Sequence, residues 1–281
     1  MCGLAGAFDP GTEAAAWPAR LAGMAAALEH RGPDDAGSWH DAQAGLGLTF
    51  RRLAILDLSV EGHQPMRSAS GRFVIAYNGE VFNFAALRAE LETTGAQFRG
   101  HSDTEVMLAA LEAWGLLASV KRFVGMFAFA LWDRAERRLH LVRDRLGIKP
   151  LYWGWSGGAL LFGSEMTALR RHPSFSAVLD RDAVASFLRF NYVPAPYAVF
   201  TGFRKLEPGC IRTFDLATPR SGDAGSVSAY WSLADVAREG AANPFAGDER
   251  EAVDELERRL AESVGLRMVA DVPLGAFLSG G

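Results

Sequence analysis

The central part of the chain, residues 124–162, constrains the fold most, because its apolar residues come in short runs separated by turns. These runs are Val124–Trp132, Arg138–Arg143, Leu151–Trp155 and Leu160–Phe162, with Gly, Ser, Asp and Arg between them. Short apolar runs bounded by turn residues are typical of neighbouring antiparallel strands. Even the longest run falls far short of the roughly 18 residues that a membrane span requires, so it is interpreted as a buried strand.

Strand-like and helical patterns also precede this region, in separate groups. Strands are predicted over Gly3–Phe8, Gly45–Phe50, Arg52–Leu58 and Phe73–Tyr77. Helices are predicted over Ala14–Glu29, Ala85–Thr94 and Asp103–Trp114, the last beginning after Ser102, whose side chain is suited to cap it. Strands grouped with strands, with helices outside them, favour a layered α+β fold over alternating βαβ units.

The composition changes near residue 218 and marks a boundary. Residues 218–225 and 240–247 are rich in Gly, Ser, Pro and Asp, as loops are. Beyond them, Val253, Leu256, Leu260 and Val264 have helical spacing, and residues 272–278 are predicted to form a buried strand. We therefore expect one domain over 1–217, a connecting segment over 218–250 and the start of a second domain over 251–281.

Composition and charge exclude several classes of protein. A chain of 281 residues with 49% hydrophobic and 22% charged residues is typical of soluble globular proteins. A net charge of −4 with dispersed Lys and Arg argues against nucleic-acid binding. The N-terminus lacks the basic region of a signal peptide, and two cysteines do not make a disulfide framework, so we expect a cytoplasmic protein without membrane association.

Cys2 follows the initiator Met1 directly. If Met1 is removed, one residue carries both a thiol and an α-amine whose unperturbed pKa of about 8 suits it to act as a base. An N-terminal amine that activates its own side chain is a known form of nucleophilic catalysis. The alternative is that Cys2 is an ordinary small buried residue, and its position alone favours that interpretation.

A series of motifs in fixed order changes this balance. In chain order the motifs are Met1-Cys2-Gly3, His30-Arg31-Gly32-Pro33-Asp34, Arg52-Leu53-Ala54-Ile55-Leu56-Asp57, Tyr77-Asn78-Gly79-Glu80-Val81-Phe82-Asn83, Ser102-Asp103-Thr104-Glu105, Gly125-Met126-Phe127-Ala128-Phe129 and Arg143-Asp144-Arg145-Leu146-Gly147-Ile148-Lys149-Pro150-Leu151-Tyr152. Together they resemble the glutamine-hydrolysing asparagine synthetases, in which a class II glutaminase domain with an N-terminal nucleophile precedes an ATP-using synthetase domain. The resemblance implies a four-layer αββα sandwich, followed by the first helix and strand of an α/β nucleotide-binding domain.

The resemblance assigns catalytic roles to Cys2, Asn78 and Gly79. Cys2 would attack the side-chain amide of glutamine while its α-amine moves protons, and Asn78 with the Gly79 N–H would stabilise the oxyanion. Taken by itself, Asn-Gly between apolar residues is a two-residue hairpin signal. Both interpretations are compatible with a tight turn that directs a backbone N–H outward.

The resemblance also assigns a glutamine-binding set. Arg52 would clamp the α-carboxylate through two parallel hydrogen bonds, a geometry that Lys does not reproduce. Glu80 and Asp103 would bind the α-ammonium, and Ile55 belongs to the same set. Without the resemblance, Asp103 is explained as an acid in the first turn of a helix.

Two further motifs are assigned supporting roles around the pocket. These are the motif containing His30, which we expect to be a hydrogen-bonded structural histidine, and the motif spanning residues 143–152. No cluster of His, Cys or carboxylate residues has metal-ligand spacing, so no metal is predicted in the glutaminase domain.

The last ten residues resemble the strand and opening of a pyrophosphatase-type nucleotide loop. Leu278, Ser279, Gly280 and Gly281 would contribute part of an ATP site, because small residues let backbone N–H groups approach phosphate. The Asp, Ser and helix that continue this loop in the family are absent, so we expect glutaminase activity at most from this chain. In the family, ATP and Mg²⁺ serve the synthetase part, where aspartate becomes asparagine, and members often form dimers.

Two alternatives remain open from the sequence. The same glutaminase could supply ammonia to another acceptor, such as a sugar, a peptide or a small acid. The chain could instead be a non-catalytic fragment that binds glutamine or a partner. An uncleaved Met1 would favour that second alternative, because it blocks the α-amine of Cys2.

Overall fold

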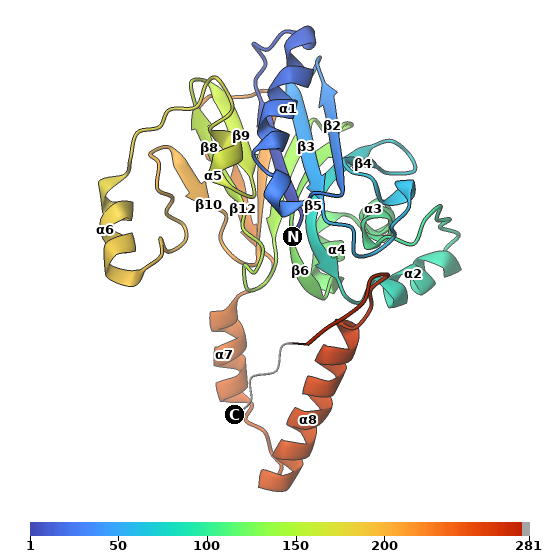
Figure 1. Ribbon diagram of the computed structural model, residues 1–281. Coiled ribbons are helices and arrows are strands. Elements are labelled where there is room, and N and C mark those ends of the chain that lie inside the picture. The colour runs from blue at the N-terminus through green and yellow to red at the C-terminus, as the bar shows by residue number, and fades with distance from the viewer. Residues whose placement is uncertain (277–281) are drawn as a thin grey trace.

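The computed structural model of the protein describes residues 1–276, in which two six-stranded antiparallel sheets lie face to face (Figure 1). The first sheet has the order β10, β8, β9, β1, β3 and β2, formed by Phe203–Lys205, Tyr152–Ser156, Ala159–Gly163, Gly3–Phe8, Leu46–Arg52 and Asp35–Asp41. The second has the order β12, β11, β7, β6, β5 and β4, formed by Ser226–Ala229, Cys210–Asp215, Arg138–Arg143, Gly125–Asp133, Phe73–Val81 and Met66–Arg67.

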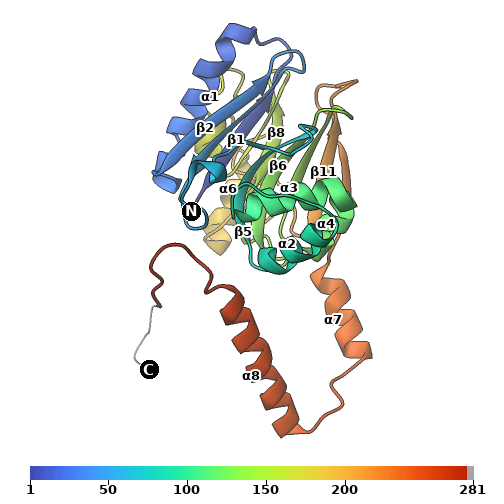
Figure 2. The same ribbon diagram turned by 90° about the vertical axis from the view of Figure 1, so that its right-hand side faces the viewer.

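Helices cover the outer face of each sheet, and this gives four layers (Figure 2). The helices over the first sheet are α1 (Trp17–Ala26) and α5 (Met166–Leu169), and those over the second are α2 (Phe84–Thr93), α3 (Asp103–Trp114) and α4 (Leu116–Arg122). A third apolar cluster, with Phe50, Trp132 and Phe162 fully or almost fully buried, fills the space between the sheets. The expected αββα sandwich is therefore confirmed.

Most of the expected strands and helices are present, but two predictions in the site region are wrong. Only Arg52 of the predicted strand Arg52–Leu58 belongs to a strand, because the carbonyl groups that follow turn inward to the Arg52 guanidinium. The strand β2 was not predicted. Its side chains alternate only between half-buried and exposed, so its sequence lacks a clear apolar face.

Asn78-Gly79 does not form the predicted hairpin turn. Both residues lie inside β5, where they pair with Ala128 and Phe127 of β6 in a ladder that runs from Phe73 to Val81. Glycine is required at position 79 for close packing, since a Cβ there would lie 2.2 Å from the carbonyl oxygen of Met126. The Asn-Gly pair thus reflects a tight approach of two strands.

The C-terminal part of the chain is built differently from the sandwich. The segment expected to connect two domains contains β12 and the helix α7 (Leu233–Ala242), and the long helix α8 (Glu249–Leu266) follows at the predicted place. Both helices project from the sandwich in Figure 1, and the chain after α8 turns back towards it. Residues 272–276 form no strand, because no sheet neighbour for them is present in the described part of the chain, and residues 277–278 lie outside it.

The helix α6 (Arg181–Phe190) lies at the periphery of the sandwich, as Figure 1 shows. Asp180 caps its first turn, accepting from the N–H groups of Asp182 and Ala183. Several of its large apolar side chains remain about half exposed or more, among them Phe187 and Leu188. This helix contributes little to the core and does not reach the candidate site.

Candidate active site

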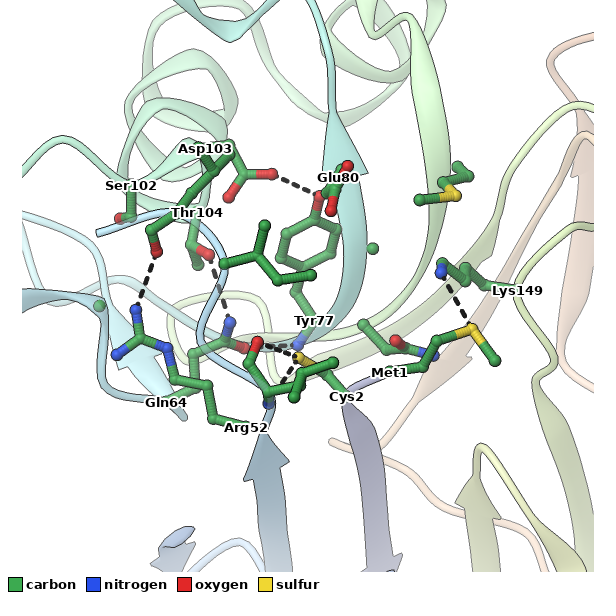
Figure 3. Close-up of a pocket in the computed structure, with 17 residues that line it drawn as sticks. Met1, Cys2, Arg52, Gln64, Tyr77, Glu80, Ser102, Asp103, Thr104 and Lys149 are labelled. Carbon is green, nitrogen blue, oxygen red and sulfur yellow. Dashed lines mark hydrogen bonds between the residues drawn. The ribbon is translucent and has the colours of Figure 1, made fainter. Parts of the chain in front are cut away.

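One cavity of about 110 Å³ lies between the ends of β1, β3 and β5 and the start of α3. Figure 3 shows the side chains that line it. All seven predicted glutaminase residues border this cavity, namely Cys2, Arg52, Ile55, Asn78, Gly79, Glu80 and Asp103. Residues up to 101 positions apart in the sequence therefore form one site, with β1 and β3 from one sheet and β5 from the other.

Cys2 stands immediately before β1, and its sulfur is held by the backbone of Leu53. The Leu53 N–H donates to Sγ over 3.3 Å, and the thiol donates to the Leu53 carbonyl over 3.5 Å. Burial is the main cause that raises the pKa of the Cys2 thiol. A thiol with a raised pKa needs a nearby base to become a nucleophile at neutral pH.

That base is not yet on Cys2, because Met1 is present. The terminal amine belongs to Met1, where burial is the main cause that lowers its pKa. The Met1 side chain also borders the cavity, and its Sδ accepts from Lys149 Nζ over 3.4 Å. Removal of Met1 would both place the free amine on Cys2 and open the cavity.

The Asn78 side chain offers an unused donor to the cavity. Asn78 is 1% exposed, and its Nδ2 has no acceptor among residues 1–276. It shares its face of β5 with Val74 and Ala76, two residues of the cluster between the sheets, so it points towards the sheet that carries Cys2. A buried amide nitrogen without an acceptor is costly unless a ligand supplies one.

The Gly79 N–H is directed to the same region by the strand pattern. The N–H and C=O of its partner Phe127 both bond to Asp144, so Gly79 forms a non-hydrogen-bonded pair with Phe127. Its N–H therefore points away from β6, as do those of Tyr77 and Val81 two residues on either side, which donate to Gln64 and Asp103. Along β5, the Gly79 N–H lies between the N–H groups of Tyr77 and Val81, and Gly79 itself lines the cavity.

Arg52 ends β3 and is fixed by the loop that follows it. Its guanidinium donates to the carbonyls of Leu56 at 3.0 Å, Ser59 at 3.2 Å and Asp57. A Cβ at Gly62 would lie 1.9 Å from Nη2, so glycine is required beneath the guanidinium. Three of the five N–H groups of an arginine are thereby used, which leaves the Nε–H and one Nη1–H to donate to a ligand.

Two acids lie at the far side of the cavity from Arg52. Asp103 is 6% exposed, and its Oδ2 accepts from the Tyr77 hydroxyl at 2.6 Å and the Val81 N–H at 2.9 Å. Burial is the main cause that raises the pKa of both Asp103 and Glu80, and the nearby charge of Asp103 raises that of Glu80 further. A ligand ammonium between the two carboxyl groups would restore their charged forms.

Sequence reasoning did not single out Gln64 or Lys149 as residues of the cavity. The Gln64 amide connects two walls of the cavity, since it accepts from Tyr77 N–H at 2.7 Å and donates to Thr104 at 3.2 Å. Lys149 was assigned a supporting role with its motif, yet it borders the cavity with 4% exposure, and burial is the main cause that lowers its pKa. A single Lys within an otherwise apolar Ile148-Lys149-Pro150-Leu151 run was the signal available.

The rest of that motif does support the site, as expected. Arg143 donates to the carbonyls of Gly147, Lys149 and Leu206, and Asp144 accepts from the N–H groups that follow it. His30 is exposed and hydrogen-bonded to Glu165 at 3.2 Å, outside the cavity. The structural role predicted for this histidine is thus consistent with its contact.

The predicted nucleotide-site residues, Leu278, Ser279, Gly280 and Gly281, lie outside the described residues. Within residues 1–276, no group of three or more His, Cys, Asp or Glu side chains is arranged to hold a metal ion. In the same residues, no helix combines the length and apolar character needed to cross a membrane.

Comparisons with known proteins match two family models to separate parts of the chain. Residues 1–231 match the family model described as the glutamine amidotransferase domain, and residues 255–281 match that of asparagine synthase. Asparagine synthetase (glutamine-hydrolyzing) 1 of Bacillus subtilis is 35% identical over 285 residues, covering 100% of this chain and 42% of its own length. A Mycobacterium tuberculosis relative, also described as an asparagine synthetase, is 38% identical over 301 residues, covering 100% of this chain and 44% of its own.

The chain thus spans less than half the length of these two relatives. Among solved structures, glutamine phosphoribosylpyrophosphate amidotransferase from Bacillus subtilis superposes with a TM-score of 0.57 at 22% identity, over 83% of this chain and 50% of that chain. At this identity the likeness concerns the fold alone, and it agrees with the αββα layering.

Proposed function

The chain belongs to the glutamine amidotransferase domain family, and on that premise we propose that Cys2 hydrolyses glutamine to glutamate and ammonia once Met1 is removed. The observation that supports this most directly is the shared cavity. The sulfur of Cys2, the unpaired Asn78 amide and the Arg52 guanidinium all border it. These are a nucleophile, an oxyanion donor and a carboxylate ligand, which are the groups that hydrolysis of an amino-acid amide requires.

The reaction proceeds through a thioester. The Cys2 sulfur attacks the side-chain carbonyl carbon of glutamine, and the thiol proton passes to the α-amine of Cys2. Asn78 Nδ2 and the Gly79 N–H donate to the oxyanion. The amine returns its proton to the leaving nitrogen as the C–N bond breaks, so that ammonia departs. Water then attacks the thioester, which releases glutamate and restores the thiol.

Arg52 and the two acids select the substrate. The two remaining N–H groups of Arg52 bind the α-carboxylate, and Asp103 with Glu80 binds the α-ammonium. Both carboxyl groups have pKa values raised mainly by burial, because their charged forms are unfavourable in the empty cavity. A bound ammonium group stabilises these charged forms. A glutamine analogue that lacks the α-ammonium should therefore bind poorly.

The test is a comparison of the two cysteines of the chain. Cys2→Ala abolishes glutamate release, whereas Cys210→Ala, a change at the start of β11 remote from the cavity, leaves it at the wild-type rate. A diazo-ketone analogue of glutamine adds its mass to the wild type and to the Cys210 variant, but not to the Cys2 variant. Intact mass also reports whether Met1 has been removed. Hydrolysis that persists without Cys2 contradicts the proposal, and a processed wild type that binds glutamine without cleaving it favours a binding role.

The ammonia serves a second reaction in the longer protein. The two relatives are described as asparagine synthetases, and the match of residues 255–281 supports aspartate as the acceptor, with ATP and Mg²⁺ as the activating pair. Leu278–Gly281 would contribute to the ATP site. The experiment is to supply a full-length protein with amide-labelled glutamine, ATP and aspartate and to look for labelled asparagine. Label in another amide, or in free ammonia only, contradicts aspartate as the acceptor.

The same proposal covers assembly and location. A homodimer is expected for the full-length protein, and sedimentation analysis distinguishes it from a monomer. A cytoplasmic location is supported by the two free cysteines, Cys2 and Cys210, since Cys2 must stay reduced to act.

A further inference from the structure

The segment after α8 returns to the sandwich and contacts it at two places. The guanidinium of Arg267 lies 4.4 Å from the ring centroid of Phe82, the residue that follows β5. Four residues later, Asp271 contacts the loop between β3 and the next short helix. Figure 1 shows this part of the chain lying against the sandwich after the excursion through α7 and α8.

Asp271 bridges two backbone groups of that loop. Its N–H donates to the Ile55 carbonyl at 2.9 Å, and its Oδ2 accepts from the Asp57 N–H at 2.7 Å. The same oxygen lies 2.8 Å from His101 Nε2. One partly exposed residue of the C-terminal segment thus holds the loop on one side and the residue before the α3 cap on the other.

The loop needs such support because of its backbone conformation. Asp57 has a φ of 55°, in the left-handed region that residues other than glycine adopt uncommonly and that Asp tolerates when its side chain forms local hydrogen bonds. Its fully buried carboxylate stabilises the turn by accepting from the N–H groups of Ser59 at 3.1 Å and His101 at 2.9 Å. Asp271 contributes the bond to the Asp57 N–H, which the loop itself does not satisfy.

The same loop supplies the carbonyls that orient Arg52. The carbonyl oxygens of Leu56 and Asp57 both accept from Arg52 Nη2. Asp271 bonds to the backbone of Ile55 and Asp57, so it holds the same three-residue stretch. Movement of Ile55 or Asp57 would therefore turn the guanidinium and change the direction of its two free N–H groups. Ile55 itself borders the cavity.

We propose that Asp271 is a positioning residue for glutamine, which acts from the C-terminal segment through residues 55–57 on the Arg52 guanidinium. This inference rests on the proposed glutaminase function. It makes the affinity for glutamine depend on where the start of the second domain lies, so that the glutaminase site is fully formed only when this segment is in place. Asp271 touches no substrate atom, and its effect falls on binding rather than on the chemical step.

The kinetic test uses the full chain with Met1 removed and three variants. Asp271→Ala removes the carboxylate and is expected to raise KM for glutamine about five- to tenfold, the size that the net loss of one hydrogen bond of ordinary strength produces, with kcat close to wild type. Asp271→Asn keeps an oxygen that accepts from the Asp57 N–H, so its KM should lie between those of the Asp271→Ala variant and the wild type. The matched control is Asp254→Ala, because Asp254 is an exposed acid of α8 whose carboxylate has no hydrogen-bond partner among residues 1–276.

Hydrogen exchange provides a readout that does not need activity. Asp271→Ala should speed exchange of the amides at residues 55–59, whereas Asp254→Ala should not. An unchanged KM in Asp271→Ala, or a loss confined to kcat, overturns the positioning role. Unchanged exchange in the loop overturns it as well.

These outcomes separate the two proposals. A wild-type chain that is processed at Met1 but does not hydrolyse glutamine contradicts the proposed function, and with it this inference. A wild-type chain that hydrolyses glutamine, with the same KM in the wild type and Asp271→Ala, contradicts this inference alone.

Discussion

Helices α3 and α8 begin alike and end in different environments. Ser102 caps α3 by accepting from the Glu105 N–H, and Asp248 caps α8 in a reciprocal box with Glu251. The apolar residues of α3, such as Val106, are buried against the second sheet. Those of α8 have the same helical spacing, yet Leu260 is 57% exposed. Local signals therefore set where a helix starts, and they do not decide whether its apolar face finds a partner.

This difference divides the molecule into a sandwich and an arm, which we define as residues 232–276. The sandwich holds its site through contacts between residues far apart in sequence. In the arm, α7 and α8 have no buried residues, and the segment after α8 is tied to the sandwich through Arg267 and Asp271. Removing a side chain should accordingly have a large effect in the sandwich and a small one in the arm.

The largest expected difference comes from matched truncations of apolar side chains. Phe162→Ala deletes a fully buried ring between the sheets and should lower the free energy of unfolding by about 3–5 kcal/mol. Leu260→Ala on α8 should change it by less than about 0.5 kcal/mol. Denaturant unfolding followed by tryptophan fluorescence measures the sandwich specifically, because all seven tryptophans precede the arm. A comparable loss in both variants would mean that α8 packs as a core helix.

The next largest effect is a pH dependence confined to the sandwich. Burial is the main cause that lowers the pKa of His172 to about 4, and its Nδ1 accepts from the Ser174 N–H. The unfolded chain therefore binds a proton before the folded one does, so stability is complete above about pH 6.5 and falls as the pH drops towards 4. The difference between the pKa of 6.5 in the unfolded chain and about 4 in the folded protein corresponds to at most about 3 kcal/mol of stability.

His172→Gln should flatten this part of the stability profile, measured by denaturant titrations at several pH values. The arm contains no histidine, so histidine protonation between pH 6.5 and 4 should not change the helicity of α7 and α8. His140, whose pKa is also lowered to about 4 mainly by burial, provides a second variant with the same expected direction. An unchanged pH profile in both variants would contradict the buried neutral state of these histidines.

A smaller effect is expected at the cap of α8. Asp248→Ala removes the carboxylate that accepts from the Glu251 N–H at 2.9 Å and should destabilise the helix by about 1 kcal/mol. Hydrogen exchange should speed in the first turns of α8, while the tryptophan unfolding transition of the sandwich stays in place. Asp254→Ala, in the middle of the same helix, is the control. A shift of the sandwich transition would show that the arm and the sandwich unfold together.

The sequence predicted the parts of the fold that local patterns determine. The strands between residues 125 and 163, the start of α3 at Asp103 and the helix α8 were all found from periodicity and caps. The Arg52–Leu58 strand and the Asn78-Gly79 turn were wrong, because tertiary contacts override local preference at both places. In each case the residues concerned line the cavity, where backbone groups contact cavity side chains instead of following the local preference.

The candidate site shows the same limit. Its seven residues were selected through the motif resemblance, and the structure brings all of them to one cavity. Periodicity alone would not have joined Cys2 to Asp103, because their proximity depends on two sheets meeting. Gln64 was missed since its role lies in two hydrogen bonds, with Tyr77 and Thr104, and a single sequence carries no trace of them. Asp271 was missed for the same reason.

The smallest expected effect tests whether the arm is truly exposed. Glu255 pairs with Arg258 and Arg259 at 2.6–2.9 Å, and hydrogen bonds from these two arginines lower its pKa to about 2. That low pKa suggests strong pairing, but exposed pairs are screened by water and salt and contribute little to stability. Glu255→Gln should therefore loosen α8 less than Asp248→Ala does in hydrogen exchange, and the difference from wild type should vanish near 1 M salt, where the Debye length is about 3 Å. A loss as large as that of the cap variant and independent of salt would place these charges in a desolvated environment, and the contrast between sandwich and arm would then fail.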